Sequence, residues 1–372
     1  MRKIFRYFRD RRFEYEPLVS VSIYKDRLLH NFNQYKNTFG KKGVAPVLKS
    51  NAYGHGLVQI AKILDGECVP FFVVDSYHEA LILRNEGIKT KILVMGFALT
   101  PNIFKSYFKN VSFTIGDMLV LKKIAHELTS PQKFHIKIDI GMHRQGIMKE
   151  DISEAITLIK SNPNIEIEGV CSHFSDPVNK SFTEKQIIIW NKSVEDFKTE
   201  FSEISYFHIS ATEGYSYRGS VSANCMRLGL GLYGIGEKEL SLLPTIEVST
   251  SVTGIKKIPV GEVVGYGSTF KTEKDTTLGI VPAGYYEGVD RRLSNKGFFK
   301  IGNFFVQIAG RISMNISTFN ALDVSLEIGQ KIILISSNPE DKNSVENIAK
   351  MCDTIPYEIL VHINPQLRRT LA

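Results

Sequence analysis

The hydrophobic positions of the chain follow one rhythm up to about residue 234. Short apolar runs alternate with segments in which apolar residues recur every three or four positions, as expected for strands that alternate with amphipathic helices. Eight runs have the length and composition of buried strands, at 44–48, 71–74, 91–95, 111–115, 134–140, 165–171, 206–209 and 227–232. Because eight strand–helix units close a parallel barrel, we predict a TIM-like α/β barrel.

The segments between the runs carry helix signals. Asp117 is predicted to cap the helical pattern at 118–128, and Thr183 and Gln186 have the spacing of a capping box before the apolar stripe at 190–201. We expect that stripe to belong to the core.

A second domain is predicted where the rhythm changes. After about residue 236, runs rich in Val, Ile and Thr are separated by Gly and Pro, and only 344–351 has a helical pattern. A chain of 372 residues also exceeds the usual size of one core. We therefore predict a basic N-terminal arm at 1–17, the barrel at 18–236 and a β-rich domain at 237–372.

Charge and cysteine usage favour a cytoplasmic enzyme. The formal net charge is +7, but the first 17 residues hold six basic and three acidic residues, so the excess is mild and partly terminal. The four cysteines are far apart and show no metal or redox spacing, which predicts reduced thiols and no metal site. Arginines interrupt the first 12 residues before an apolar stretch long enough for a signal peptide can form. No later segment has about 18 consecutive apolar residues, so a membrane span is not expected either.

The segment P-V-L-K-S-N-A-Y-G-H-G at 46–56 carries the strongest chemical signal. Its lysine, Lys49, ends a predicted barrel strand, which is where barrel active sites lie. Partial burial lowers the pKa of an amine and makes it a nucleophile for imine chemistry. A lysine in this position is nevertheless more often a salt-bridge partner, and His55 alone is more often an ordinary polar loop residue.

The whole segment resembles the cofactor segment of the alanine racemase family. That resemblance implies a barrel, a β domain and pyridoxal 5′-phosphate as cofactor. It also implies that Lys49 forms an imine with the cofactor and that Tyr53 binds the cofactor phosphate.

Three further barrel segments match the family in order. I-K-I-D-I-G-M-H-R-Q-G at 136–146 implies that Arg144 contacts the cofactor phenolate and the substrate carboxylate, supported by Lys137. Lys137 is either carbamylated or an unmodified lysine beside an anion, and both remain open. S-H-F and F-H-I-S-A-T supply His173, His208 and Thr212, with His173 and Thr212 on the cofactor side.

The segment M-R-L-G-L-G-L-Y-G at 226–234 resembles the arginine strand of the family. Arg227 is implied to face the pyridine nitrogen, while the amides near Gly229 and Leu230 are implied to hold phosphate. An arginine donates a hydrogen bond but does not give up its proton. The cofactor ring would therefore remain a weaker electron sink, which favours reprotonation over side reactions.

The β-rich domain supplies the remaining matches. V-V-G-Y-G-S-T-F at 263–270 implies that Tyr266 is the second catalytic base, and A-G-R-I-S-M-N at 309–315 implies that the Met314 amide binds the substrate carboxylate. Tyr357 is implied to bind the cofactor phosphate.

The resemblance implies racemisation of alanine, with D-alanine supplied to peptidoglycan. Lys49 and Tyr266 would act on opposite faces of the α-carbon. A free tyrosine is a poor base at neutral pH, and His173 is implied to assist Tyr266. Because the family places the matching tyrosine and methionine on the neighbouring subunit, a homodimer with shared sites is implied.

Several residues depart from the family pattern near the substrate. Ala211 and Thr212 replace asparagine and serine, Asn315 follows Met314 where aspartate is usual, and His143 replaces a glycine. Alanine is the favoured substrate, while serine or a broader amino-acid specificity remains open.

Other protein classes fit less of the chain. A related decarboxylase would share the cofactor but not the segments around Arg227 and Tyr266, and a non-catalytic pyridoxal-phosphate carrier would not need the β domain. A nucleic-acid-binding protein would rest only on the net charge of +7 and the basic arm, without any recognised binding motif.

Overall fold

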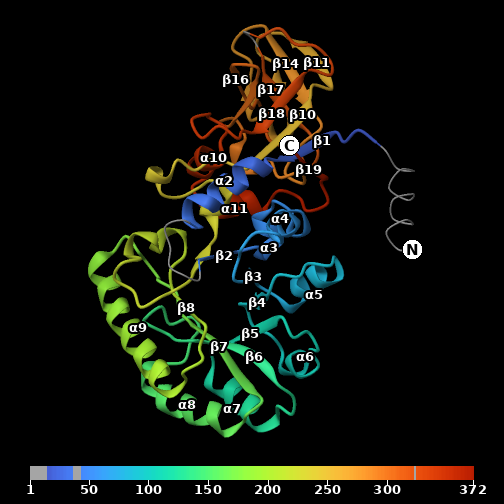
Figure 1. The fold of residues 1–372 in the computed structure, drawn as a ribbon. Helices are drawn as coiled ribbons and strands as arrows, with labels where there is room; N and C mark the ends of the chain where they lie inside the picture. The colour runs from blue at the N-terminus through green and yellow to red at the C-terminus, as the bar shows by residue number, and fades with distance from the viewer. Residues whose placement is uncertain (1–14, 37–42, 322–323) are drawn as a thin grey trace, which may run out of the picture. The chain divides into compact units, whose positions relative to one another are not determined.

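The computed structural model describes residues 15–36, 43–321 and 324–372. The chain forms two compact units (Figure 1). The barrel unit is Tyr24–Thr245, and the β unit combines the described residues up to Ile23 with Ile246–Ala372. Most of the predicted basic arm, 1–14, lies outside the described residues.

Eight parallel strands form the barrel unit, and each overlaps one of the eight predicted runs. They are β2 (Val44–Pro46), β3 (Phe72–Val74), β4 (Ile92–Val94), β5 (Val111–Ile115), β6 (Gln132–Lys137), β7 (Ile165–Cys171), β8 (Tyr206–His208) and β9 (Met226–Leu228). Strands β3 to β8 pair in sequence order, and β2 pairs with β9. A bridge from Val47 to Val73 joins β2 to β3. The Arg227 amide donates to the Ser210 carbonyl and closes the ring, which confirms the predicted fold class.

Helices surround these strands (Figure 1). The helices of the unit are α2 (Lys25–Lys36), α3 (Lys49–Tyr53), α4 (Leu57–Leu64), α5 (Tyr77–Asn85), α6 (Thr100–Phe104), α7 (Met118–Glu127), α8 (Ile152–Ser161) and α9 (Lys180–Glu200). The predicted cap of α7 is confirmed, because the Asp117 carboxylate accepts from the amides of Leu119 and Val120.

The predicted capping box of α9 is wrong. The helix begins one turn earlier, where the Asn179 side chain accepts from the Phe182 amide. Thr183 and Gln186 are consequently buried inside the helix. Their side chains bond to the preceding loop: the Thr183 hydroxyl donates to the Asp176 carbonyl, and Gln186 Oε1 accepts from Ser175.

The β unit contains three sheets. The largest has the order β16 (Phe304–Gln307), β15 (Phe298–Ile301), β18 (Lys331–Ile335), β10 (Ile246–Ser251), β1 (Val19–Ile23) and β19 (Arg369–Leu371). The other two are β11 (Gly254–Ile258), β14 (Thr276–Val281) and β17 (Ser317–Asn320), and the pair β12 (Val263–Val264) and β13 (Phe270–Lys271). The predicted helix at 344–351 is α10 (Val345–Met351), capped by Ser344, and α11 (Pro356–Val361) follows.

The units differ from the predicted domains at both boundaries. Strand β1 belongs to the β unit rather than the barrel, because it pairs with β10 and β19 and buries Val21 and Ile23 completely. Residues 237–245 remain with the barrel unit. Asn31 on α2 fixes them through hydrogen bonds with both the amide and the carbonyl of Leu243.

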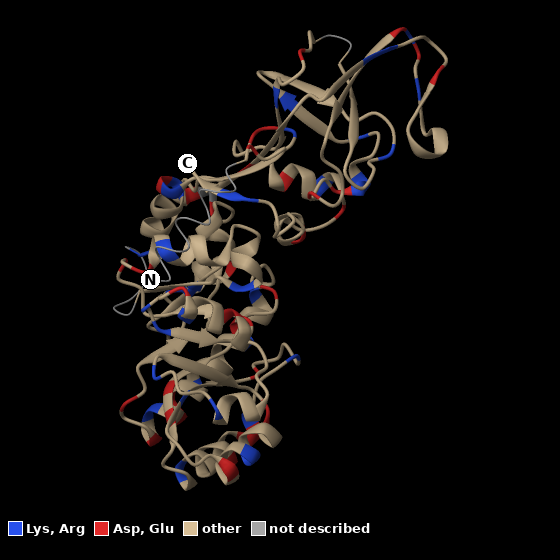
Figure 2. Ribbon diagram, turned by 90° about the vertical axis from the view of Figure 1, so that its right-hand side faces the viewer, with Lys and Arg blue, Asp and Glu red and all other residues tan. Residues whose placement is uncertain are grey.

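Charged residues are distributed over both units. Figure 2 shows basic and acidic positions interspersed along helices and loops. Among the helices of the described residues, none combines the length and apolar character that crossing a membrane requires.

Candidate active site

Lys49 begins an unusual turn at the carboxyl end of β2. The Leu48 amide donates to the Val73 carbonyl at 2.7 Å, which fixes the backbone just before the half-buried lysine. The next four residues, Ser50 to Tyr53, have φ angles of 56°, 56°, 52° and 51°. A left-handed conformation costs roughly 1–2 kcal/mol per L-residue, so neighbouring groups must hold this turn in place.

The Glu79 carboxylate provides much of that support. Its Oε1 accepts from the amides of Ser50 at 2.7 Å and Asn51 at 3.4 Å. Its Oε2 accepts from the amides of Asp75 and Ser76, and Ser76 in return caps α5. One carboxylate therefore ties the turn after Lys49 to the start of a helix.

His55 anchors the end of the same loop. Its imidazole is fully buried, with Nδ1 at 3.0 Å from the Tyr53 carbonyl and Nε2 at 2.9 Å from the Thr245 hydroxyl. The ring packs on Tyr233, with centroids 4.3 Å apart. This residue thus has a structural role in positioning the Lys49 loop.

Tyr53, Thr212 and the turn after β9 form a small polar cradle. A Cβ added to Gly229 would lie 3.1 Å from the Tyr53 hydroxyl and 4.0 Å from the Thr212 hydroxyl. The Gly231 amide donates to that Thr212 hydroxyl at 3.0 Å, and Leu230 starts a short 3₁₀ turn. Hydroxyl groups and turn amides of this kind bind phosphate oxygens.

Arg227 is a buried cation at the centre of the barrel unit. Its guanidinium donates to the carbonyls of Ser172 at 2.7 Å, His208 at 2.9 Å and Ile209 at 3.0 Å. It also faces His208 Nδ1 at 2.7 Å and His173 Nδ1 at 3.2 Å. These partners hold the guanidinium in one orientation although none of them is a carboxylate.

Positive charges act on the buried imidazole of His173, and Arg227 Nη2 lies 3.2 Å from its Nδ1. Burial lowers the pKa of this histidine to about 3, and the charges of Arg227, Lys137, Arg144 and Lys49 act in the same direction. The histidine therefore stays neutral at physiological pH. The four cations provide a binding region for anions, such as a phosphate or a carboxylate.

Lys137 and Arg144 line a cavity of about 240 Å³. Burial lowers the pKa of Lys137, and its ammonium group donates to Gln145 Oε1 at 3.0 Å. Arg144 is exposed in the loop after β6. In that loop His143 has a φ of 53°, a conformation that glycine adopts without strain.

The β unit contains the other predicted site residues. Tyr266 begins the short 3₁₀ helix Tyr266–Ser268 and is 72% exposed. Met314 lies in a loop and is 55% exposed, and Tyr357 lies on α11. The Asn315 amide donates to Glu287 Oε1 at 2.8 Å. The predicted site residues from Lys49 to Leu230 all belong to the barrel unit. The other four belong to the β unit: Tyr266, Met314, Asn315 and Tyr357.

Three polar residues that contact the candidate site or its supporting side chains were not identified from the sequence. They are Glu79, His135 and Glu168. Glu79 forms a capping box with Ser76, and the S-x-x-E spacing was visible in the sequence. His135 precedes Lys137 by two positions on β6, so strand alternation predicts that both face the same side.

Comparisons with known proteins identify one family across both units. Residues 23–237 match the family model for the alanine racemase N-terminal domain, and residues 245–371 match that for the C-terminal domain. An alanine racemase of Thermodesulfovibrio yellowstonii is 32% identical over 356 residues, covering 94% of this chain and 97% of the relative. One from Borreliella burgdorferi is 31% identical over 365 residues, covering 94% and 96%.

Solved structures agree with the sequence comparisons. An alanine racemase of Clostridium difficile 630 superposes with a TM-score of 0.88 at 29% identity, covering 96% of this chain and 97% of that one. The alanine racemase of Bacillus anthracis with bound L-Ala-P has a TM-score of 0.88 at 25% identity, covering 97% and 96%.

Glu79→Gln should loosen the turn after Lys49. The glutamine amide keeps one acceptor oxygen but places its NH₂ group against backbone N–H donors. We therefore expect the free energy of local opening of the turn to fall by roughly 1–3 kcal/mol. Hydrogen–deuterium exchange of residues 49–56 measures this loss. Glu154→Gln, at an exposed ion pair with Lys122, is the control, and equal exchange in both variants would contradict the role of Glu79.

Proposed function

Because the chain belongs to the alanine racemase family, we propose that it is an isomerase that interconverts L- and D-alanine with pyridoxal 5′-phosphate. The observation that carries this proposal is that the barrel unit contains the half-buried Lys49, the hydroxyl and amide donors around Gly229 and the buried guanidinium of Arg227. Such a set of groups suits an anionic cofactor together with the carboxylate of an amino acid. D-Alanine for peptidoglycan is the product that this activity supplies.

The residues present fit the proposed cofactor. Lys49 offers a half-buried amine for its aldehyde, and the cradle around Tyr53, Thr212 and Gly229 offers hydroxyl and amide donors for its phosphate. Gly229 matters for space, since a Cβ there would crowd the Tyr53 hydroxyl at 3.1 Å. When bound, this cofactor withdraws electrons from the α-carbon of an amino acid and thereby makes its α-proton acidic.

Arg227 and Arg144 have separate roles. Arg227 would hold the pyridine nitrogen of the cofactor as a hydrogen-bond donor that keeps its own proton. Arg144 would hold the substrate carboxylate and the phenolate oxygen, and Lys137 lines the same cavity as Arg144. Burial lowers the pKa of Lys137, which favours the neutral amine, the form that reacts with carbon dioxide to give a carbamate.

Proton transfer requires a group on each face of the α-carbon. Lys49 serves one face, and Tyr266 serves the other with His173 as its hydrogen-bond partner. The exposure of Tyr266 and Met314, 72% and 55%, supports a homodimer in which each chain lends these residues to the site of its partner.

Alternatives to alanine concern the substrate rather than the chemistry. Serine or a broader amino-acid range is the second candidate, because Asn315 replaces the usual aspartate and Thr212 the usual serine. A decarboxylase is less favoured by the family comparisons. The four cysteines are free within the described structure, which supports the cytoplasm as the compartment.

Lys49→Ala should abolish racemisation and also the borohydride-reducible bond between cofactor and protein. Purified protein with cofactor and L-alanine is expected to form D-alanine, measured by chiral chromatography over a panel of L-amino acids. Lys62→Ala, at an exposed ion pair with Glu86, is the control. Borohydride fixation to a different lysine in the unaltered enzyme would refute the assignment.

Tyr266→Phe should slow racemisation by about 10²–10⁴, the usual contribution of one acid or base. One face keeps its group, so one alanine enantiomer should still exchange its α-proton in D₂O without inversion. Mass spectrometry of each enantiomer measures this exchange, with Tyr107→Phe, an 81% exposed tyrosine, as control. Small and equal effects on both enantiomers would exclude Tyr266 as a base.

Asn315→Asp should change substrate choice rather than proton transfer. The new carboxylate would lie beside Glu287, which Asn315 now contacts at 2.8 Å, and the added negative charge would weaken binding of a substrate carboxylate. We expect a higher KM and a changed ranking of alanine, serine and larger amino acids by kcat/KM. An unchanged ranking would leave Asn315 with only a structural role.

A further inference from the structure

A line of polar side chains crosses the interior of the barrel unit from the candidate site to the opposite end of the strands. Arg227 Nη1 lies 2.7 Å from His208 Nδ1, and His208 Nε2 lies 2.8 Å from His135 Nδ1. His135 Nε2 in turn faces Glu168 Oε2 at 3.7 Å. Both imidazoles are fully buried.

The chemistry of arginine fixes the proton positions along this line. Arg227 can only donate, so His208 Nδ1 must accept and the proton of neutral His208 lies on Nε2. That proton is donated to His135 Nδ1, which leaves the His135 proton on Nε2. This nitrogen faces Glu168 Oε2 at 3.7 Å, within ion-pair distance but too far for a hydrogen bond. Burial lowers the pKa of both histidines, in agreement with two neutral rings.

Glu168 supplies the negative end of the line. Burial alone would raise the pKa of its carboxyl group, but His135, Lys91 and Ser112 face it and hold the pKa well below its usual range. Oε1 pairs with Lys91 at 2.6 Å, and Oε2 accepts from the Ser112 hydroxyl at 2.5 Å. The carboxylate is therefore ionised and held in place.

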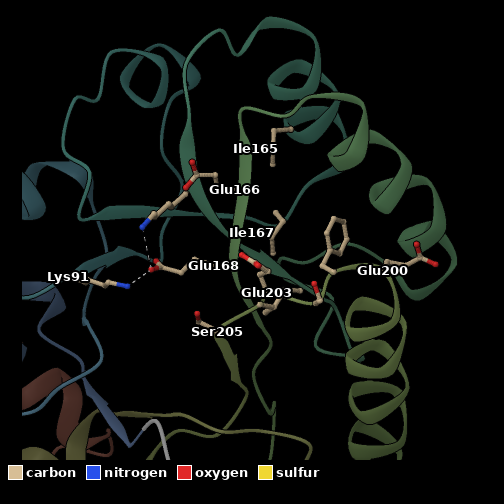
Figure 3. A pocket seen from close by; sticks show the side chains of 12 residues that line it. Lys91, Ile165, Glu166, Ile167, Glu168, Glu200, Glu203 and Ser205 are labelled. Atoms are coloured by element: carbon tan, nitrogen blue, oxygen red, sulfur yellow. Dashed lines mark hydrogen bonds and ion pairs between the residues drawn. The ribbon is translucent and has the colours of Figure 1, made fainter.

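The far end of the line lies at a second pocket. Figure 3 shows Glu168 and Lys91 directed toward each other in a pocket of about 560 Å³. Its lining includes Ile165, the first residue of β7, and Ser205, just before β8. The pocket is thus at the amino ends of the strands, opposite to the Lys49 end.

Close packing prevents the two imidazoles from rotating freely. His135 pairs with Gly169 across β6 and β7, and a Cβ on Gly169 would lie only 2.5 Å from His135 Nδ1. Phe71 packs its ring against both histidines, with centroids at 5.3 Å and 5.5 Å. The imidazole of His135 therefore fits in this position only because residue 169 is a glycine.

We propose that His135 and Glu168 are positioning residues that stabilise the His208 tautomer required by Arg227 and thereby hold the Arg227 guanidinium in its orientation toward the cofactor ring. The proposal rests on the proposed function for the meaning of that donor, but the tautomers are a property of the protein itself. With Glu168 neutral, His135 has no anion to direct its Nε2 proton. The opposite tautomer would then set two N–H groups against each other at the contact with His208.

The first test reads the tautomers directly. Long-range ¹H–¹⁵N spectra of full-length protein labelled with ¹⁵N-histidine distinguish the two nitrogens of each ring, and His135→Asn and His208→Asn assign the signals. We expect both rings to be neutral with the proton on Nε2. A proton on Nδ1 of either ring would overturn the proposal, whether or not the protein racemises alanine.

The second test removes the negative charge of Glu168 while keeping a side chain of the same size and shape. Glu168→Gln should give mixed tautomers at His135, shift the absorption of the bound cofactor and lower kcat about tenfold, a barrier change of about 1.4 kcal/mol. KM for alanine should change less than about twofold, because no substrate contact is lost. The control is Glu166→Gln, the same change two residues earlier in the same pocket. It should leave the His135 tautomer, the absorption of the bound cofactor, kcat and KM unaltered.

A third variant displaces His135 while keeping every polar group. Gly169→Ala places a methyl group against its Nδ1 and should reproduce the changes in spectrum and kcat seen for Glu168→Gln. If Glu168→Gln leaves the tautomers, the absorption and kcat unchanged, the line has no positioning role. If the tautomers are as expected but no amino acid is racemised, the proposed function fails and the proton positions stand.

Discussion

The buried guanidinium of Arg227 is the constraint on which the interior of the barrel unit depends. A charge removed from water must be met by hydrogen-bond acceptors, and its partners are main-chain carbonyls and two imidazoles rather than a carboxylate. Each imidazole is thereby restricted to one protonation state. The same cation, with three others nearby, leaves an excess of positive charge that an anionic cofactor and its substrate can neutralise.

The sequence predicted the barrel well because buried parallel strands are apolar on both faces and therefore appear as continuous runs. The two units of the structure differ from the predicted domains at their boundaries for a different physical reason. The run at 19–23 has no local sign of its partners, which lie on β10 and β19 more than 200 residues later. Pairing partners rather than composition decide to which unit this strand belongs.

Motif order, rather than any single residue, is the basis on which the sequence predicts the site residues. The barrel unit contains Lys49, Tyr53 and Arg227, yet the turn after Lys49 could not be foreseen, since Ser50 to Tyr53 include no glycine. Glu79 holds that turn from 29 residues away along the chain. His135 and Glu168 were also missed. The contacts of a single polar residue in an apolar strand depend on the register between neighbouring strands, which the sequence does not give.

The position of β1 between β10 and β19 in the six-stranded sheet has a consequence for synthesis on the ribosome. Val21 and Thr370 are hydrogen-bonded across 349 positions, so the first strand to be made is among the last to be paired on both sides. At about 5–20 residues per second, translation of the intervening chain takes on the order of 20–70 s. The barrel unit, whose strands are contiguous in sequence, can form during that interval. Until then both hydrogen-bonding edges of β1 are unpaired, and an unpaired strand edge is a site at which chains associate.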